Sequence, residues 1–554
     1  MAVEAAPPAP ARGARALDWL RANWLLLAMC VLAALPVIVS TAHELVAGWA
    51  PAGDDAVIAT RSYDVFSSRS PLVGQYSAAS TALGQATYSP GPLLYWLLAI
   101  PARIAPILML LTMALLNAAC AVGVVLLARR RGGALLMIAA ATGMALMARS
   151  LDQHVWADVW NPAAALMPFA LLIFVTLSLA CGELWLLPLA VAVASFVVQC
   201  HLGYAIPVAG LLLVGLVGLF LARRRGDLSG GRRSLLVALG VAVACWIAPL
   251  IEQLRHWPGN LSAIAHAATG RGETLGLARG LHELVGAIGV PPYWGRASRT
   301  VNERLYDVAF DHGFARDASA VVLIVLLIAV AVLALRRRDR VVAFACAQAL
   351  VLCAAIVAVT ASVPTAKGLG FTVAYTLWWS APAGMYAWLV AGWGVTRAVA
   401  PLGRLLEGRG LRAVAALGVV VAVLATIDAT PGPDELEARY RPVRDLRGPL
   451  AAAVRGHGSV RVDIAGRWTF PKFDFQTAIA YELRRHGVDV RAPSLRVNLG
   501  SRYARGGEPG RVVRVGDPSL RPGPAGRVIA RVAISPDSGV FVGKPETVVV
   551  TVGP

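Results

Sequence analysis

The segment at residues 53–77, GDDAVIATRSYDVFSSRSPLVGQYS, gathers adjacent carboxylates and two guanidinium groups directly after the first long apolar run. Residues 54–66 are predicted to form a helix that begins at Asp54 or Asp55, because acidic side chains favour the positive end of the helix dipole. Asp54 and Arg61 are seven residues apart, so they share one side of that helix. A carboxylate that can exchange a proton and a cation that can bind an anion would therefore face the same volume.

Apolar residues on this helix and in the run that follows place this chemistry at a membrane boundary. The helix has an apolar stripe, formed by Val57, Ile58, Val65 and Phe66, and we expect it to lie along the membrane surface. Residues 88–104, YSPGPLLYWLLAIPARI, carry prolines within an apolar run and are predicted to be an interfacial or re-entrant segment. An outer loop with a capping aspartate is the alternative that these patterns leave open.

The composition indicates a polytopic α-helical membrane protein. Hydrophobic residues make up 57% of the 554 residues and charged residues 15%, where a soluble domain carries about 25% charged residues. The mean hydropathy is +0.64. The formal charge of +19 could suggest nucleic acid. Much of it lies in short arginine clusters at the ends of apolar runs, which are typical of cytoplasmic loops, so no nucleic-acid partner is predicted.

The apolar runs predict eleven spans with a defined orientation. The spans are expected at about 23–47, 103–128, 132–148, 162–180, 184–202, 205–222, 235–254, 318–335, 341–362, 373–395 and 412–429. Residues 1–22 are predicted to be a disordered cytoplasmic tail, with a signal peptide cut near VSTAH as the alternative. Every strong arginine cluster between spans then falls inside. The outer face of the plasma membrane receives loops 48–102 and 255–317 and everything after residue 430.

Residues 430–554 are predicted to form a small extracytoplasmic α/β or α+β domain. Strands are expected at SVRVDIAG, VDVRAP, VVRVGD, RVIARVAIS and ETVVVTVG. FQTAIAYELRRHG is predicted to be a helix closed by Gly487. The arginines of this domain either bind an anionic polymer or form a solvated basic surface, and the second interpretation is favoured. The seven cysteines lie in or beside apolar runs and are interpreted as packed thiols.

Further polar residues stand at the outer ends of the predicted spans. His154 and Asp158 lie in a short loop whose tryptophans are interpreted as interfacial anchors. His201 ends the fifth span, where either a ligand role or a structural hydrogen bond would explain it. Glu252 ends the seventh span, where an acid is costly and suggests a function. A salt bridge between Glu252 and Arg255 is an equal alternative.

Several motifs together resemble the GT-C superfamily of integral-membrane glycosyltransferases. They are an aspartate in the first outer loop, the helix that follows it, the multi-span core and the exported C-terminal domain. The chain is most similar to actinobacterial members related to the protein O-mannosyltransferase and lipid A aminoarabinose transferase group. GDDAVIATRSYDV matches their acid pair and helix, whereas YSPGP has Tyr88 and Ser89 where a Trp/Ser-His pair is commoner. VWADVWNPAAALMPF, SFVVQCHLGYAIP and IAPLIEQLRHWPGNLS also resemble family segments, and the resemblance covers residues 20–430.

The resemblance implies transfer of a sugar from a polyprenyl-phosphate carrier to an envelope glycan or glycolipid hydroxyl. It implies Asp54, with Asp55 as second candidate, as general base at the outer face of a bacterial plasma membrane. The departing phosphate needs positive charge, and the candidates are Arg61, Arg69, Arg255 and Lys367. A divalent cation is compatible with these carboxylates, but this loop has no DxD motif, so no required metal or other cofactor is predicted.

The predicted donor and acceptor pocket includes an aromatic pair from loop 255–317. Tyr293 and Trp294 could stack on a sugar or on the carrier lipid, or form a packed turn. The predicted pocket residues are Tyr88, His154, Asp158, His201, Glu252, Tyr293 and Trp294.

Two functions of other classes remain as alternatives. A transporter or flippase of lipid-linked sugars usually has charged or broken spans at mid-membrane, whereas the span centres here almost entirely lack acids and bases. A non-catalytic scaffold that binds wall polymer through residues 430–554 would not need Asp54 or Asp55.

Overall fold

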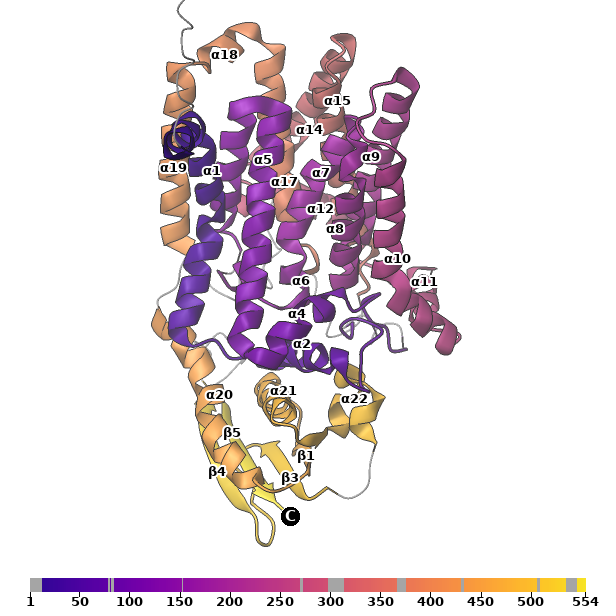
Figure 1. The fold of residues 1–554 in the computed structure, drawn as a ribbon, viewed down its shortest axis with the longest axis vertical. Coiled ribbons are helices and arrows are strands. Elements are labelled where there is room, and N and C mark those ends of the chain that lie inside the picture. Colours follow the sequence, from indigo (N-terminus) through magenta and orange to yellow (C-terminus); the bar gives the residue numbers. More distant parts are fainter. Residues whose placement is uncertain are drawn as a thin grey trace, which may run out of the picture.

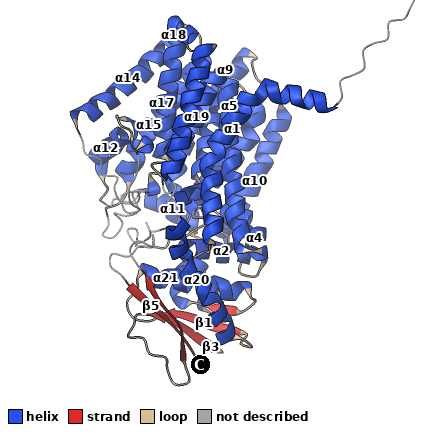
Figure 2. Ribbon diagram, turned by 90° about the vertical axis from the view of Figure 1, so that its left-hand side faces the viewer, coloured by secondary structure: helices blue, strands red, loops and turns tan. Residues whose placement is uncertain are grey.

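The computed structural model has two parts, a helical bundle and a small α/β domain at one end of it (Figure 1). Among the residues that the structure describes, helices make up most of the bundle and every named strand lies in the terminal domain (Figure 2). The structure describes residues 12–77, 80, 84–151, 153–269, 273–296, 313–365, 375–429, 433–505, 509–534 and 546–554. The predicted fold class, a polytopic helical core with a small C-terminal α/β domain, is confirmed.

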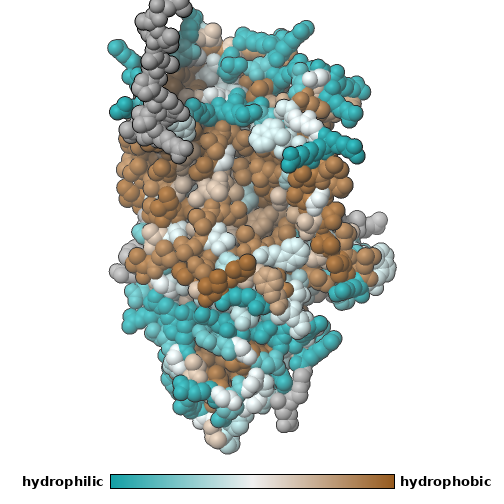
Figure 3. All heavy atoms as spheres, in the orientation of Figure 1, coloured by the Kyte–Doolittle hydropathy of each residue, from teal (hydrophilic) through white to brown (hydrophobic). Residues whose placement is uncertain are grey.

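Most bundle helices are long and apolar, as expected for residues that a bilayer solvates. The helices are α1 (Arg12–Ala47), α2 (Gly53–Tyr63), α4 (Leu93–Ile104), α5 (Pro106–Met147), α6 (Asn161–Ala164), α7 (Leu166–Ala180), α8 (Leu187–Cys200), α9 (Ala205–Arg225), α10 (Arg232–Arg255), α11 (Asn260–Thr269), α12 (Gly276–Ile288), α14 (Phe314–Arg336), α15 (Arg340–Ser362), α17 (Ser380–Ala398), α18 (Ala400–Leu405) and α19 (Arg409–Ala429). Within the described residues, eight helices are long and apolar enough to cross a membrane. On the face drawn in Figure 3, a belt of hydrophobic residues crosses the middle of the bundle, between hydrophilic ends.

Helix α5 covers two of the predicted spans, because the chain turns within it. Gly133 has a non-helical backbone, with φ 71° and ψ −161°. Ala102 precedes α5 and accepts a hydrogen bond from Tyr481 of the C-terminal domain, while Trp160, beyond α5, lies beside α2. Both flanks of α5 therefore lie at the same end of the bundle. Every predicted span overlaps a helix, and the number of membrane crossings stays a prediction.

The arginine clusters gather at the bundle end opposite the C-terminal domain. Glu183 pairs with arginines of the 129–131 cluster, and Asp339 pairs with Arg397 at 2.9 Å. Helix α18 marks this end, at the top of Figure 1. This common location agrees with the predicted inner loops, and which end faces the cytoplasm stays a prediction.

The C-terminal domain pairs a mixed sheet with two long helices. Its elements are α20 (Pro433–Val454), β1 (Ser459–Ile464), α21 (Phe470–Arg485), β2 (Asp489–Arg491), α22 (Arg496–Leu499), β3 (Arg511–Gly516), β4 (Arg527–Ile534) and β5 (Glu546–Gly553). The strand order is β2-β1-β3-β5-β4, with β1 parallel to β2 and β3 and the remaining pairs antiparallel. All five strands and the helix before Gly487 were predicted, whereas α20 was not.

Helix α2 lies between the two parts, which corrects its predicted position on the membrane surface. Ile58 is fully buried in the apolar core of the bundle, and Val57 is fully buried in the core of the C-terminal domain. Phe66, just beyond the helix, remains 63% exposed. The apolar residues of α2 are thus covered by protein on both sides instead of by lipid.

Candidate active site

The first turn of α2 presents Asp54 to the bundle. Its Oδ1 accepts a hydrogen bond from Gln75 Nε2 at 2.9 Å, and its Oδ2 accepts one from the indole Nε1 of Trp160 at 3.1 Å. Burial raises the pKa of Asp54 and nearby Asp158 raises it further, while the bonds from Trp160 and Gln75 oppose the shift. The net increase makes this carboxylate a stronger base than a free aspartate.

A chain of polar contacts joins Asp54 to Arg61. Gln75 accepts a hydrogen bond through Oε1 from the Tyr95 hydroxyl, at 3.0 Å. The Arg61 guanidinium lies 5.9 Å from the centre of the Tyr95 ring. Gln75 and Tyr95 thus connect Asp54 and Arg61, and the placement of these two residues on one side of the helix stays a prediction.

An aromatic wall stands beside Asp54. The Trp160 ring meets Tyr375 and Trp378 edge to face, with centroids 4.9 and 5.6 Å apart. His201 continues the wall at 5.9 Å from Tyr375. Its Nδ1 accepts a hydrogen bond from the Gly203 backbone N–H. Trp160, interpreted from the sequence as an interfacial anchor, thus contacts Asp54 directly.

The YSPGP turn is fastened to the start of α11 and, through it, to the C-terminal end of α10. Asn260 accepts a hydrogen bond from the Tyr88 backbone N–H at 2.9 Å and donates one to the Tyr88 carbonyl at 3.1 Å. Glu252 Oε2 in turn accepts the Asn260 backbone N–H at 2.9 Å. Its other oxygen lies 3.6 Å from His256 Nδ1, so the nearby basic partner of Glu252 is His256. Tyr88 and Glu252, both predicted pocket residues, are joined through Asn260.

Asp55 lies in a buried charge cluster that includes Asp54, Asp158 and Arg439 of α20. Burial raises the pKa of Asp55 well above its usual range; neighbouring Asp158 adds to the increase and Arg439 of α20 opposes it. Asp474 of α21 stands over Gly53, where an added Cβ would overlap its carboxylate. Burial raises the pKa of Asp474 to about 7. Asp55 is therefore surrounded by ionisable groups of both parts of the protein.

Two predicted phosphate ligands contact the C-terminal domain instead of an open volume. Arg61 donates through Nη1 to the Leu499 carbonyl at 2.6 Å. Arg69 pairs with Asp489, and its guanidinium lies 4.3 Å from the centre of the Tyr503 ring. Both side chains therefore help to dock this domain, and their phosphate role stays a prediction.

The other predicted residues occupy different surroundings. Arg255 is exposed at the end of α10. Tyr293 and Trp294 form a packed turn, with the Tyr293 hydroxyl 2.7 Å from Ser380 Oγ and the Trp294 indole donating to the Ala287 carbonyl. The His154 side chain and all of Lys367 lie outside the described residues.

Three contact residues of Asp54 and its neighbours were not predicted. Gln75, Tyr95 and Tyr375 have no motif or spacing that would distinguish them from other polar and aromatic residues near span ends. Within the part of the chain that the structure describes, no group of three His, Cys, Asp or Glu side chains could hold a metal ion.

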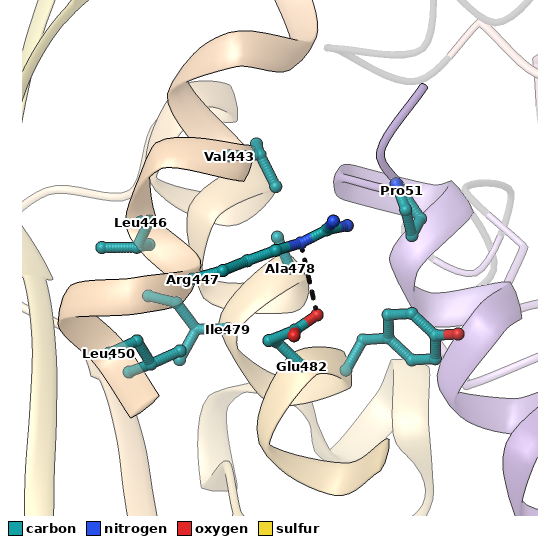
Figure 4. A pocket seen from close by; sticks show the side chains of 9 residues that line it. Pro51, Val443, Leu446, Arg447, Leu450, Ala478, Ile479 and Glu482 are labelled. Atoms are coloured by element: carbon teal, nitrogen blue, oxygen red, sulfur yellow. Dashed lines mark ion pairs between the residues drawn. The ribbon is translucent and has the colours of Figure 1, made fainter. Parts of the chain in front are cut away.

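A small hollow between α20 and α21 lies next to Pro51 (Figure 4). Arg447 and Glu482 face each other across it, with Nε and Oε2 3.5 Å apart. Its volume is about 10 Å³, which suits roughly one water molecule. This hollow is too small for a sugar or a lipid head group.

No family model and no curated protein matches the chain. Solved structures do match, and two of them are of one protein. One is ArnT from Cupriavidus metallidurans bound to undecaprenyl phosphate, which is 14% identical, covers 96% of this chain and 98% of its own, and has a TM-score of 0.46. The other is the same protein in the apo state, 14% identical over 93% of this chain and 97% of its own, with a TM-score of 0.44. The chain is similar to ArnT over nearly its whole length.

Proposed function

We propose that this protein is an integral-membrane glycosyltransferase. It moves a sugar from a polyprenyl-phosphate carrier to a hydroxyl of an envelope glycan or glycolipid. The observation that carries the proposal is the setting of Asp54, a carboxylate of raised pKa held by Trp160 and Gln75 beside an aromatic wall. A basic carboxylate next to ring faces suits an acceptor hydroxyl on a sugar.

The chemistry assigns one task to each group. Asp54 takes the proton of the acceptor hydroxyl as its oxygen forms a bond to the anomeric carbon. The bond from that carbon to the phosphate oxygen breaks, and the electron pair stays on the phosphate. The N–H groups of Gln75 and Trp160 fix the carboxylate, so that its lone pair is already oriented when the acceptor arrives. No metal is required in this scheme, since positive side chains can neutralise the leaving group.

Arg255 is the preferred candidate for the phosphate ligand, because its side chain is exposed. It is exposed at the end of α10, a helix that is mostly uncovered within the bundle. A carrier whose tail lies in the bilayer would bring its phosphate to such a helix end. Arg61 remains a second candidate, because the contact with Leu499 occupies only one of its nitrogens.

The site is assigned to the outer face of a bacterial plasma membrane. The arginine clusters gather at the opposite end of the bundle, and such clusters usually remain in the cytoplasm. A carrier-linked sugar is suitable as a donor where nucleotide sugars are absent.

The test is transfer by the purified protein in detergent. A panel of radiolabelled polyprenyl-phosphate sugars is supplied with a crude envelope extract as acceptor. Asp54→Asn should lower transfer from the active donor by about 100-fold or more, the usual contribution of a general base. Asp55→Asn, checked for folding, is the matched variant and should retain more activity. Full transfer by Asp54→Asn would remove the catalytic assignment, and no transfer from any donor would refute the enzyme.

A further inference from the structure

The end of α2 carries a fully buried carboxylate that the proposed chemistry does not use. Asp64 is 0% exposed. Its Oδ2 accepts a hydrogen bond from the Tyr503 hydroxyl at 2.6 Å, and its Oδ1 accepts one from Arg484 Nε at 2.9 Å. A buried charge is tolerated only when it is paired and hydrogen-bonded. The C-terminal domain, more than 400 residues further along the chain, supplies both of these partners.

Two neighbouring arginines reinforce this attachment. Arg69 pairs with Asp489, donates to the Val490 carbonyl at 3.2 Å and stacks over Tyr503. Arg61 donates to the Leu499 carbonyl. Each contact joins α2 or the segment directly after it to the same face of the C-terminal domain.

The beginning of α2 is held by the same domain. Arg444 of α20 donates through Nη1 to the Ala47 carbonyl at 2.7 Å and to the Gly48 carbonyl at 3.3 Å. Ala47 is the last residue of α1, and Gly48 begins the short connection to α2. Asp474 of α21 lies over Gly53 at the first turn. Both ends of the helix that carries Asp54 therefore depend on the C-terminal domain.

We propose that the C-terminal domain positions the catalytic helix, with Asp64 as the positioning residue that holds α2 against Arg484 and Tyr503. The inference rests on the proposed function of Asp54. Ten residues of helix separate Asp64 from Asp54, about 15 Å along the axis. A tilt of about 4° at Asp64 would then move Asp54 by about 1 Å. Misplacement of about 1 Å can lower a reaction rate by roughly 100-fold.

The experiment uses the full-length protein and three variants. Asp64→Asn removes the charge, and Tyr503→Phe removes only one hydrogen bond. The matched control is Arg461→Gln, which breaks the 2.7 Å ion pair with Asp463 on the sheet of the same domain. For each protein we would measure kcat, the donor KM, the pH profile of kcat/KM, and hydrogen exchange of the α2 backbone.

The expected result separates positioning from general destabilisation. Asp64→Asn should lower kcat by about 100-fold and leave the donor KM within about threefold, because Asp54 is displaced while the donor site remains. The acidic limb of its pH profile, where kcat/KM falls as the pH is lowered, should also move, since the contacts that set the Asp54 pKa change. A smaller folded fraction would scale the rate without moving that limb. Tyr503→Phe should show the same changes to a smaller degree, and Arg461→Gln none.

Hydrogen exchange of the α2 backbone tests the role of Asp64 independently of transfer activity. Exchange of α2 should accelerate in Asp64→Asn and in Tyr503→Phe. Unchanged exchange would overturn the inference, as would faster exchange with an unaltered kcat and pH limb. If Asp64→Asn fails to fold, Tyr503→Phe decides by the same criteria. If the parent transfers no sugar from any donor, the proposed function fails, and exchange alone decides whether Asp64 holds α2.

Discussion

Trp160→Phe should shift the pH dependence of transfer by removing one hydrogen bond from the proposed base. The indole of Trp160 donates to Asp54 Oδ2 at 3.1 Å, and a phenyl ring keeps much of the contact with Tyr375 and Trp378. A hydrogen bond to a charged group contributes about 1.5–3 kcal/mol, and one pKa unit corresponds to about 1.4 kcal/mol. Because Asp54 is only partly buried, the lower value applies.

The sign of the shift follows from the form of Asp54 that the bond favours. The indole N–H stabilises the ionised carboxylate, so its loss raises the Asp54 pKa by about one unit. Transfer needs the ionised form, so activity should begin to fall at a higher pH as the solution is acidified. At pH values above the acidic limbs of both proteins, the rate of Trp160→Phe should remain within a few fold of the parent rate.

The assay is kcat/KM for the active donor across about pH 5 to 9. Trp246→Phe is the matched control, because its indole donates to Ser195 Oγ at 3.0 Å between α10 and α8. The acidic limb should move up by about one unit in Trp160→Phe and stay in place in the control. An unmoved limb in Trp160→Phe, or an equal shift in both variants, would refute the assignment of Asp54 as the titrating base.

Three further outcomes are expected. Gly53→Ala should abolish most transfer and lower the melting temperature by several degrees, since the φ of Gly53 is 57° and the new Cβ would overlap Asp474. The control Gly448→Ala, in open space on α20, should stabilise the protein by about 0.5–1 kcal/mol. Calorimetry distinguishes the two variants. Arg255→Gln should raise the donor KM several-fold with an unchanged melting temperature, because that exposed arginine is assigned only to the phosphate; equal kinetics in parent and variant would exclude it. EDTA should leave transfer unchanged, and loss of transfer that Mg²⁺ or Mn²⁺ restores would contradict the metal-free scheme.

The elements that local patterns specify could be predicted from the sequence. The five strands of the C-terminal domain follow from short β-rich runs bounded by turns. The start of α2 followed from two acids, and the structure begins that helix at Gly53. The spans followed from apolar length, as in α7 and α15. In each case the signal lies within about twenty residues of the element it defines.

The partners of those elements could not be predicted in the same way. Val57 and Ile58 are adjacent apolar residues, and hydrophobicity alone does not distinguish a lipid-facing side chain from one buried in protein. Arg61 and Arg69 have the right chemistry for a phosphate, but residues 489–503 supply the contacts that tie both side chains to the C-terminal domain. Such distant pairings leave no periodic signal, because only the folded chain brings the groups together.

Asp54 and Asp55 show how position within a helix divides two identical side chains. Consecutive residues of an α-helix are about 100° apart around its axis, so the two carboxylates have different partners although both lie near Asp158. Asp54 meets Gln75 and Trp160, while Asp55 meets the charged groups around Arg439. The acid pair therefore joins the proposed base to the C-terminal domain that positions it. Both sets of contacts form at once because the start of α2 is buried between the core of the bundle and the core of that domain.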